Sequence, residues 1–391
     1  MRIILLLSGF LFLIATEVLR VYFIMPFPGS QQMNSIDIAY FLHVHINQLR
    51  AVGLLLIAFP ASYYLRRSGK MPKIAIGIGL LVFLVIFYFF NYRFTADRMF
   101  LQPGKVAFSG YSETPFDQSN LIVGVTINGE SRAYPIELIG YHHQVRDTVG
   151  GKPVMVTYCT VCRTGRVYAP EVDGTPERFR LVGMDHFNAM FEDSRTGSWW
   201  RQVSGEAIAG PLKGSYLKEV PSEQMALGAW INAHPGSLIL LPDSTFSEKY
   251  EHLAEYDEGT VESELTGRDS ASWKDKSWVV GLETGKVSKA YDWNLLSEKR
   301  VINDVLDGIP VLLVLEDDSL TFHAWDRDTL MFVLPDSTGM LTDLNTRSEW
   351  NWKGICENGP LTGERLKWLP AYQEFWHSWR TFHGSDVYEK E

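Results

Sequence analysis

The chain has 391 residues, of which 46% are hydrophobic, and it carries a formal net charge of −10 at pH 7. This acidic balance argues against a surface that binds nucleic acid. The sequence also lacks the glycine spacing of a dinucleotide fingerprint, so we expect no nucleotide cofactor.

Three apolar blocks lie near the N-terminus, at residues 3–27, 49–65 and 74–90. A membrane span needs about 20 mostly apolar residues, and we expect each block to form a transmembrane helix in contact with lipid. The first block follows Arg2 and also has the composition of a signal peptide. Because no small-x-small cleavage site follows it, the prediction is an uncleaved span.

Positive charges predict the orientation of these helices. The connection between the second and third blocks is basic, whereas residues 26–48 contain no Lys or Arg. The basic residues are Arg66, Arg67, Lys70 and Lys73. The positive-inside rule places this connection in the cytoplasm. After three spans the chain emerges outside, so we expect an integral protein of a bacterial cytoplasmic membrane with a large extracytoplasmic C-terminal part.

The remaining chain contains an internal similarity. Residues 123–158 resemble residues 280–315 without a gap, at an offset of 280 − 123 = 157 positions. An Ala-Tyr pair, an Asp and a Gly-x-Pro-Val turn recur at this offset, and the similarity resumes at Asp193 and Asp343. The ordered series predicts a duplication.

Strands dominate both predicted repeats. Runs rich in β-formers follow Gly-x-Pro turns, and Asn128-Gly129 is typical of a two-residue hairpin turn. Helical segments are short, and strands and helices do not alternate as in doubly wound folds. The predicted fold is therefore α+β and β-rich, with two tandem related repeats packed together after N-terminal transmembrane helices. The predicted domains are a membrane domain (residues 1–95), a first soluble repeat with the Cys/His site (96–245) and a second, degenerate soluble repeat (246–391).

A Cys-x-x-Cys pair occurs only in the first repeat. Where it has Cys159 and Cys162, the second repeat has Glu316 and Ser319. Two thiolates on one turn suit a transition metal, and histidine most often supplies further ligands. The sequence therefore predicts a copper or zinc site. Its candidate ligands are Cys159, Cys162, His142, His143 and His186.

Other interpretations of the Cys pair stay open. An extracytoplasmic location favours a short-loop disulfide, and the pair could also be two inert thiols. Arg163 and Arg166 favour a thiolate, and hence a redox dithiol in which Cys159 attacks and Cys162 resolves, although no helix clearly begins at Cys159. A third hypothesis is a non-enzymatic scaffold or binding module with Trp-rich recognition surfaces, some of which could stack against sugars. Cys356 is expected at a small buried position.

Four motifs in order carry a resemblance to a known family. They lie in residues 133–168, in "FEDSRTGSWWRQVSGEAIAGPLKG" and in "LKEVPSEQMALGAW". The sequence resembles the family named domain of unknown function 3179 over about residues 105–242. The family pattern maps onto His142, Cys159 and Cys162, Trp200 and residues 205–211, whereas Thr160 and Arg163 depart from the common Pro and Gly. The resemblance implies a site at these residues but no activity.

The leading hypothesis is a membrane-anchored extracytoplasmic protein whose first repeat binds copper or zinc through Cys159, Cys162 and His142. No substrate, protein partner or reaction follows from the sequence.

Overall fold

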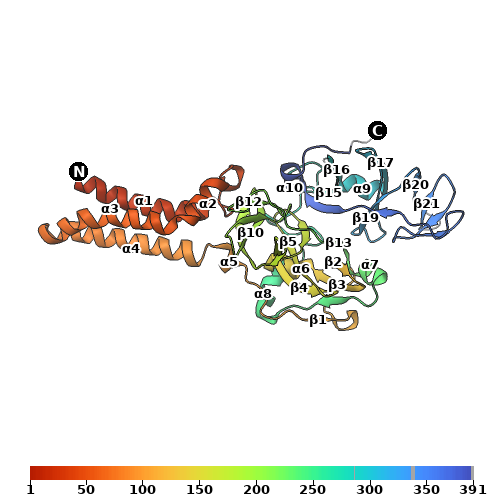
Figure 1. Ribbon diagram of the computed structural model, residues 1–391, viewed down its shortest axis with the longest axis horizontal. Helices are drawn as coiled ribbons and strands as arrows, with labels where there is room; N and C mark the ends of the chain where they lie inside the picture. The colour runs from red at the N-terminus through yellow and green to blue at the C-terminus, as the bar shows by residue number, and fades with distance from the viewer. Residues whose placement is uncertain (286, 336–339, 389–391) are drawn as a thin grey trace. The chain divides into compact units, whose positions relative to one another are not determined.

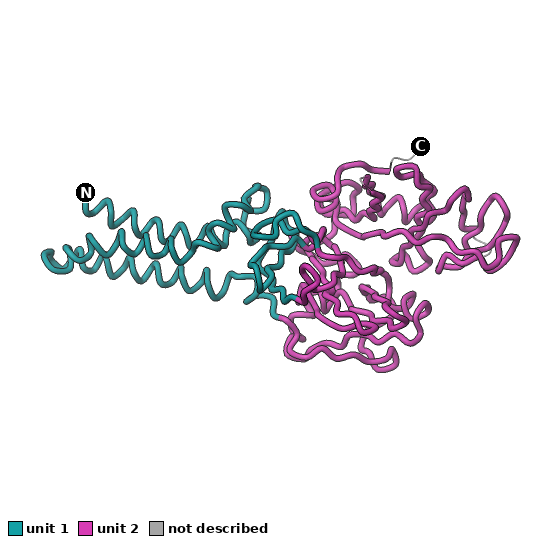
Figure 2. The backbone as a smooth tube through the Cα atoms, viewed as in Figure 1, with its two compact units in different colours: residues 1–101, 177–201, 206–216 teal, residues 102–176, 202–205, 217–391 magenta. Residues whose placement is uncertain are grey.

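A computed structural model of the chain describes residues 1–285, 287–335 and 340–388 (Figure 1). About 32% of the structure is helix and 31% is strand, which confirms the predicted α+β class. The chain forms two compact units, coloured separately in Figure 2. Unit 1 comprises residues 1–101, 177–201 and 206–216, and unit 2 comprises residues 102–176, 202–205 and 217–391.

Unit 1 begins with the three apolar segments, all of which are helical. They are α1 (Arg2–Tyr22), α3 (Ile46–Arg67) and α4 (Lys70–Tyr92), and each is long and apolar enough to cross a membrane. Leu13, Ile57 and Phe83 pack together between the helices, while many other apolar side chains remain exposed. This distribution suits helices that lipid surrounds, so the N-terminal part is compatible with a membrane anchor.

A buried polar cluster joins the same three helices. The Glu17 carboxylate of α1 is fully buried and accepts hydrogen bonds from Arg50 Nε of α3 at 2.5 Å and Asn91 Nδ2 of α4 at 2.9 Å. Arg50 Nη2 also donates to Asn91 Oδ1 at 2.7 Å. Because an unpaired buried charge between apolar helices is costly, these bonds favour one alignment of the three helices.

A four-stranded sheet completes unit 1. Its order is β12-β11-β10-β9, with β9 Phe179–Asp185, β10 Asn188–Asp193, β11 Trp199–Arg201 and β12 Ala207–Ala209. Helix α2 (Ile36–Val44) packs near it, and His43 Nε2 lies 2.9 Å from Glu192 Oε2. Met184 N donates to Ile24 O at 2.7 Å just beyond α1. These contacts fix the sheet to the segments that follow the first helix.

The first half of unit 2 contains two larger sheets and the two-stranded sheet of β7 (Glu171–Val172) and β8 (Thr175–Pro176). One larger sheet has the order β1-β14-β3-β2-β13 and the other β4-β5-β6. Their strands are β1 Phe108–Ser109, β2 Leu121–Ile127, β3 Glu130–Pro135, β4 Gln144–Val149, β5 Lys152–Cys159, β6 Thr164–Tyr168, β13 Glu223–Ala226 and β14 Leu238–Leu240. Helix α6 (Ile136–His142) follows β3, and α7 (Leu227–Ala233) follows β13. Asn128 and Gly129 join β2 to β3 with φ values of 51° and 83°, which confirms the predicted hairpin turn.

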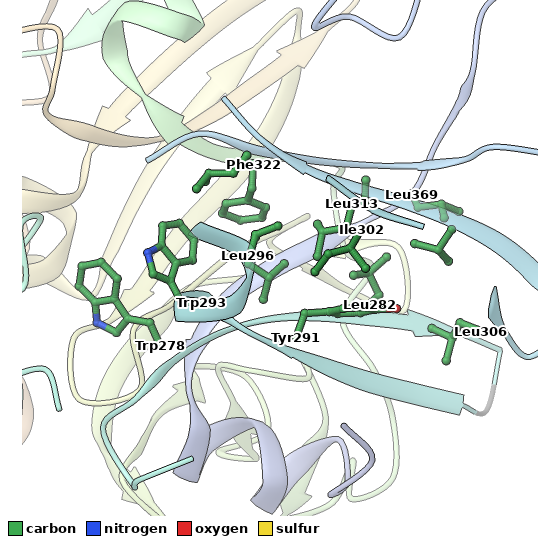
Figure 3. Close-up of a cluster of buried hydrophobic side chains, with 14 of the residues drawn as sticks. Trp278, Leu282, Tyr291, Trp293, Leu296, Ile302, Leu306, Leu313, Phe322 and Leu369 are labelled. Carbon is green, nitrogen blue, oxygen red and sulfur yellow. The ribbon is translucent and has the colours of Figure 1, made fainter. Parts of the chain in front are cut away.

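The second half of unit 2 contains the sheets β16-β15-β25, β17-β18-β19-β24 and β20-β21-β22-β23. The strands are β15 Trp278–Thr284, β16 Val287–Asp292, β17 Val301–Leu306, β18 Ile309–Leu315, β19 Phe322–Asp326, β20 Phe332–Val333, β21 Leu341–Asp343, β22 Glu349–Trp350, β23 Cys356–Asn358, β24 Lys367–Trp368 and β25 Ala371–Phe375. Helix α9 (Trp293–Lys299) follows β16, and α10 (Trp376–Phe382) follows β25. Buried side chains of these elements, among them Trp278, Leu296 and Leu313, form the core drawn in Figure 3.

Both halves begin with a hairpin, a short helix and further antiparallel strands. A tyrosine also makes the same bond in each: Tyr134 donates to Asp147 Oδ2 at 2.7 Å, and Tyr291 donates to Asp304 Oδ2 at 2.8 Å. A common origin of the halves stays a prediction.

Candidate functional site

The Cys-x-x-Cys pair lies on the tight turn between β5 and β6. Cys159 is the last residue of β5 and pairs with Thr164 of β6. Cys162 N donates to Cys159 O at 3.2 Å, and Arg163 has a left-handed φ of 55°. The pair thus belongs to a β-hairpin and not to a helix N-terminus, in agreement with the sequence. None of the three cysteines, including buried Cys356, is in a disulfide.

Residues from far along the chain hold this turn. Its successive carbonyl groups each accept a hydrogen bond from the C-terminal part of unit 2. Thr160 O accepts from Tyr256 Oη at 2.9 Å, Val161 O accepts from Lys276 Nζ at 2.7 Å, and Cys162 O accepts from Phe375 N at 2.8 Å. Because the backbone is held at consecutive residues, the two cysteines have a defined spacing.

Both thiols are completely buried beside polar side chains. Burial and the adjacent Cys159 raise the pKa of the Cys162 thiol well above its ordinary value, while the Ser378 hydroxyl and Lys276 oppose this shift. Burial lowers the pKa of Lys276 to about 8, against the influence of both cysteines. Cys162 is therefore a protonated thiol at neutral pH, next to an amine that can hold or release a proton.

His377 adds a neutral imidazole to this cluster. Its Nε2 atom lies 3.0 Å from Val161 O and 3.3 Å from Lys276 Nζ. Burial and the Lys276 charge lower the pKa of His377 to about 4. The described neighbours of the cysteines thus include an amine, an imidazole and a hydroxyl, but the amine supplies the only nearby positive charge among these three.

A buried ion pair lies next to the cluster and is linked to it through Ser378. Arg166 Nη2 of β6 lies 2.7 Å from Glu374 Oε1 of β25, and both side chains are almost inaccessible to solvent. The other carboxylate oxygen of Glu374 accepts from Ser378 Oγ at 2.7 Å. Since Ser378 also contacts the Cys162 thiol, the ion pair positions one of the groups that surround it.

The predicted ligands His142 and His143 lie at the end of α6, next to β5, where His143 O accepts from Tyr158 N at 3.1 Å, one residue before Cys159. His142 ends α6, is buried, and has its Nε2 atom 2.7 Å from Tyr250 Oη. His143 has a φ of 60°, and its Nδ1 atom lies 3.1 Å from Tyr141 O. Burial lowers the pKa of His143 to about 4, so it is neutral at physiological pH.

His186 belongs to unit 1, whereas the cysteines belong to unit 2. It lies in the turn between β9 and β10, where His186 and Phe187 both have positive φ values, of 48° and 69°. Its Nδ1 atom lies 2.6 Å from Asp185 Oδ1, and Arg201 Nη2 lies 2.6 Å from Asp185 Oδ2. Arg201 also pairs with Glu206 at 3.0 Å. His186 is therefore part of an ion-pair network of its own.

The structure does not assemble the predicted metal ligands. Across residues 1–285, 287–335 and 340–388, no three His, Cys, Asp or Glu side chains converge into a group that could hold a metal ion. Two thiols on one turn supply half of a tetrahedral zinc site, so a metal at Cys159 and Cys162 would need two further ligands.

Sequence reasoning missed the residues that do surround the cysteines. Lys276, His377 and Ser378 lie in the half that was expected to be degenerate and without chemistry. The structure supplies an alignment that the sequence did not: Trp230 and Trp379 occupy equivalent places, each against a glycine of a neighbouring strand. At the resulting offset of 379 − 230 = 149 positions, Gly228 and Ala229 stand where His377 and Ser378 are.

Comparison with known proteins agrees with the family resemblance. No curated protein and no solved structure matches the chain. The sequence model of the DUF3179 family, described as a protein of unknown function, matches residues 105–386. The match extends beyond the expected residues 105–242 and includes the second half of unit 2, which supplies Lys276 and His377. The chain therefore belongs to the DUF3179 family.

Proposed function

We propose that this protein is a membrane-anchored extracytoplasmic thiol–disulfide protein in which Cys159 and Cys162 form the redox pair. One observation carries the proposal: no disulfide joins Cys159 and Cys162, yet they are neighbours on a single turn and Cys162 interacts directly with Cys159. Adjacent thiols need little motion to form a disulfide. Of the hypotheses drawn from the sequence, the redox pair thus agrees better with the geometry than the copper or zinc site.

The reaction couples a dithiol to an external disulfide. One cysteine attacks the external S–S bond as a thiolate and forms a mixed disulfide, releasing the first external thiol. The second cysteine then attacks the mixed disulfide, which forms the Cys159–Cys162 bond and releases the second thiol. Two electrons pass to the external disulfide together with the two thiol protons. Lys276 favours the thiolate in both steps because its ammonium group lies beside the pair.

Burial sets the rate of this chemistry. Neither thiol is accessible in the closed turn, and the Cys162 proton is held tightly. Thiolate fraction and access both determine the rate of exchange. Opening of residues 160–163 therefore precedes the reaction, and exchange is slow in the native protein.

Equilibration of the full-length protein with glutathione and glutathione disulfide tests the redox pair. We expect one reversible disulfide per chain, seen by mass spectrometry after alkylation of the denatured protein. Cys159→Ser and Cys162→Ser should abolish it, and the matched control Cys356→Ser should retain it because Cys356 lies in a separate apolar cluster.

Elemental analysis of the same preparation separates the alternatives. Stoichiometric copper or zinc that is lost in Cys159→Ser would replace the redox pair by a metal site. Thiols that resist oxidation at every glutathione ratio, without metal, would show two inert cysteines.

We also propose that the connection between α3 and α4 lies in the cytoplasm and that unit 2 lies outside it. The basic residues Arg66, Arg67, Lys70 and Lys73 flank the two-residue connection between α3 and α4. We expect an alkaline phosphatase reporter fused after residue 388 to be active and one inserted at Gly69 to be inactive, because the enzyme folds only outside the cytoplasm. The opposite pattern would reverse the orientation.

Duplication is proposed for the two halves of unit 2. The matched tyrosine bonds, the left-handed residues His143 and Arg300 after α6 and α9, and the two glycine–tryptophan contacts support it. A solved structure in which the halves do not superpose over these elements would contradict it.

A further inference from the structure

A groove in unit 2 lies apart from the cysteines. Its volume is about 620 Å³, within the range of small-molecule sites, which is about 300–1,000 Å³. Three tryptophans, Trp325, Trp352 and Trp368, line it together with polar side chains. The groove plays no part in the thiol chemistry proposed above.

Two of these tryptophans are cross-strand partners in one wall of the groove. Trp325 of β19 pairs across the sheet with Trp368 of β24. Trp325 is 3% exposed and stacks on His323 with ring centroids 5.1 Å apart and an interplanar angle of 20°. Trp368 is 36% exposed. One indole is thus fixed within the wall, while the other presents much of its surface to the outside.

Carboxyl groups face the same groove. His323 Nε2 lies 2.7 Å from Glu316 Oε1, which orients that carboxylate. Glu223 of β13 also lines the groove, and burial raises its pKa while His323 opposes the shift. Basic groups of Lys353, Arg365 and Lys367 are present as well. The lining therefore offers hydrogen-bond donors and acceptors next to aromatic rings.

This combination selects among ligand classes. An apolar ligand would displace water from the carboxyl groups and offer them no hydrogen bond in return, which costs free energy. A strongly anionic ligand would meet Glu223 and Glu316, and a strongly cationic one would meet the three basic side chains. A sugar ring has apolar C–H faces that pack on aromatic rings and hydroxyl groups at its rim that both donate and accept hydrogen bonds.

We propose that this groove binds a neutral oligosaccharide, with a sugar ring lying on Trp368 and hydroxyl groups bonded to Glu223 and Glu316. The site would make the extracytoplasmic part a glycan-binding module, independent of the redox state of Cys159 and Cys162.

Binding of defined sugars to the full-length protein in detergent tests the proposal. The probes are cellotetraose, chitotetraose and maltotetraose, followed by tryptophan fluorescence and calorimetry. At least one should bind saturably. Trp368→Ala should weaken binding about tenfold or more, because stacking and burial are lost together. Trp368→Phe should recover part of the affinity, and Glu223→Gln should weaken binding without changing the unfolding midpoint.

Matched controls keep the result specific. Tyr111→Ala removes an exposed aromatic ring of unit 2 that does not line the groove, so its affinity should equal that of the unmodified protein. The Cys159→Ser/Cys162→Ser variant should bind equally well, so failure of the thiol proposal leaves this one standing. Absence of binding to all three sugars would overturn the proposal, as would unchanged affinity in both Trp368→Ala and Glu223→Gln. Preferential binding of a peptide would overturn it as well.

Discussion

Replacement of Glu374 by glutamine should destabilise the protein by about 3–5 kcal/mol, since it leaves the buried charge of Arg166 without its partner. The Glu374 side chain is inaccessible to solvent and lies 2.7 Å from Arg166 Nη2. Its carboxylate also accepts from Ser378, beside Cys162. Urea unfolding of the full-length protein in detergent, followed by tryptophan fluorescence, measures the change.

The matched control is an ion pair of the same length at the surface. Arg380 Nη2 lies 2.7 Å from Asp275 Oδ1, with side chains that are 45% and 70% exposed. Water already solvates both groups, so Asp275→Asn should cost at most about 1 kcal/mol. Equal losses in the two variants would contradict a structural role for the buried pair.

The pH dependence of stability gives a second measurement for Glu374. Burial alone would raise the pKa of this carboxyl, but His383 and Arg166 outweigh burial and hold the pKa at about 2. A carboxyl with a depressed pKa contributes stability that is complete above its ordinary pKa of about 4.5 and is lost as the pH falls toward 2. Glu374→Gln should therefore weaken the fall in stability below pH 4.5.

His383 should make the stability of the protein fall on the alkaline side of the pH profile. Its Nε2 atom lies 3.4 Å from Glu374, and Glu374 with Glu283 raises the pKa of His383 to about 9 against the effect of burial. A raised pKa contributes stability that is complete below about pH 6.5 and is lost as the pH rises toward 9. The unmodified protein should lose stability over this range, and Glu374→Gln should lose less.

Local features of this fold could be predicted from the sequence because adjacent residues encode them. Apolar length identified the three N-terminal helices, and Asn128-Gly129 identified a hairpin turn. The cysteines could be located for the same reason, since their spacing in one turn is a local property. Their environment depends on residues more than a hundred positions away, such as Lys276 and Glu374, and no local pattern encodes that contact.

From the sequence, the comparison of the two halves was used only to find residues that are peculiar to the first half. It identified Cys159 and Cys162 as present in the first half alone. Applied in reverse, it identifies Glu374 as present in the second half alone, because Met225 has the equivalent place on β13. The surroundings of the cysteines therefore combine residues peculiar to each half, and the family match covers both halves.

His142 shows where proximity in sequence misleads. It lies near the cysteines along the chain, yet its ring pairs with Tyr250 and packs on Phe246. Helix α6 ends at this residue, and its buried side chain meets α8 (Ser247–Tyr250).

Substitution of Gly281 by alanine should destabilise the protein by about 3 kcal/mol or more, at the upper end of the range for overpacked cores. A Cβ atom at Gly281 would lie 1.9 Å from Trp379 Cζ3, so the indole must move. Trp379 is fully buried and stacks on His383 at 4.2 Å, and its displacement would disturb the ion pairs of Glu374. Gly124 and Trp230 have the same relation in the other half, at 2.3 Å.

A smaller ring at position 379 should relieve this clash, and the double variant measures the relief. Trp379→Phe alone should be destabilising because it leaves a cavity, but Gly281→Ala with Trp379→Phe should be more stable than the sum of the two losses by about 1 kcal/mol or more. Gly236→Ala is the control, since nothing lies within 4 Å of the added Cβ atom, and its effect should stay within about 0.5 kcal/mol. Strictly additive losses in urea unfolding would show that the cost of the alanine does not arise from the space that Trp379 occupies.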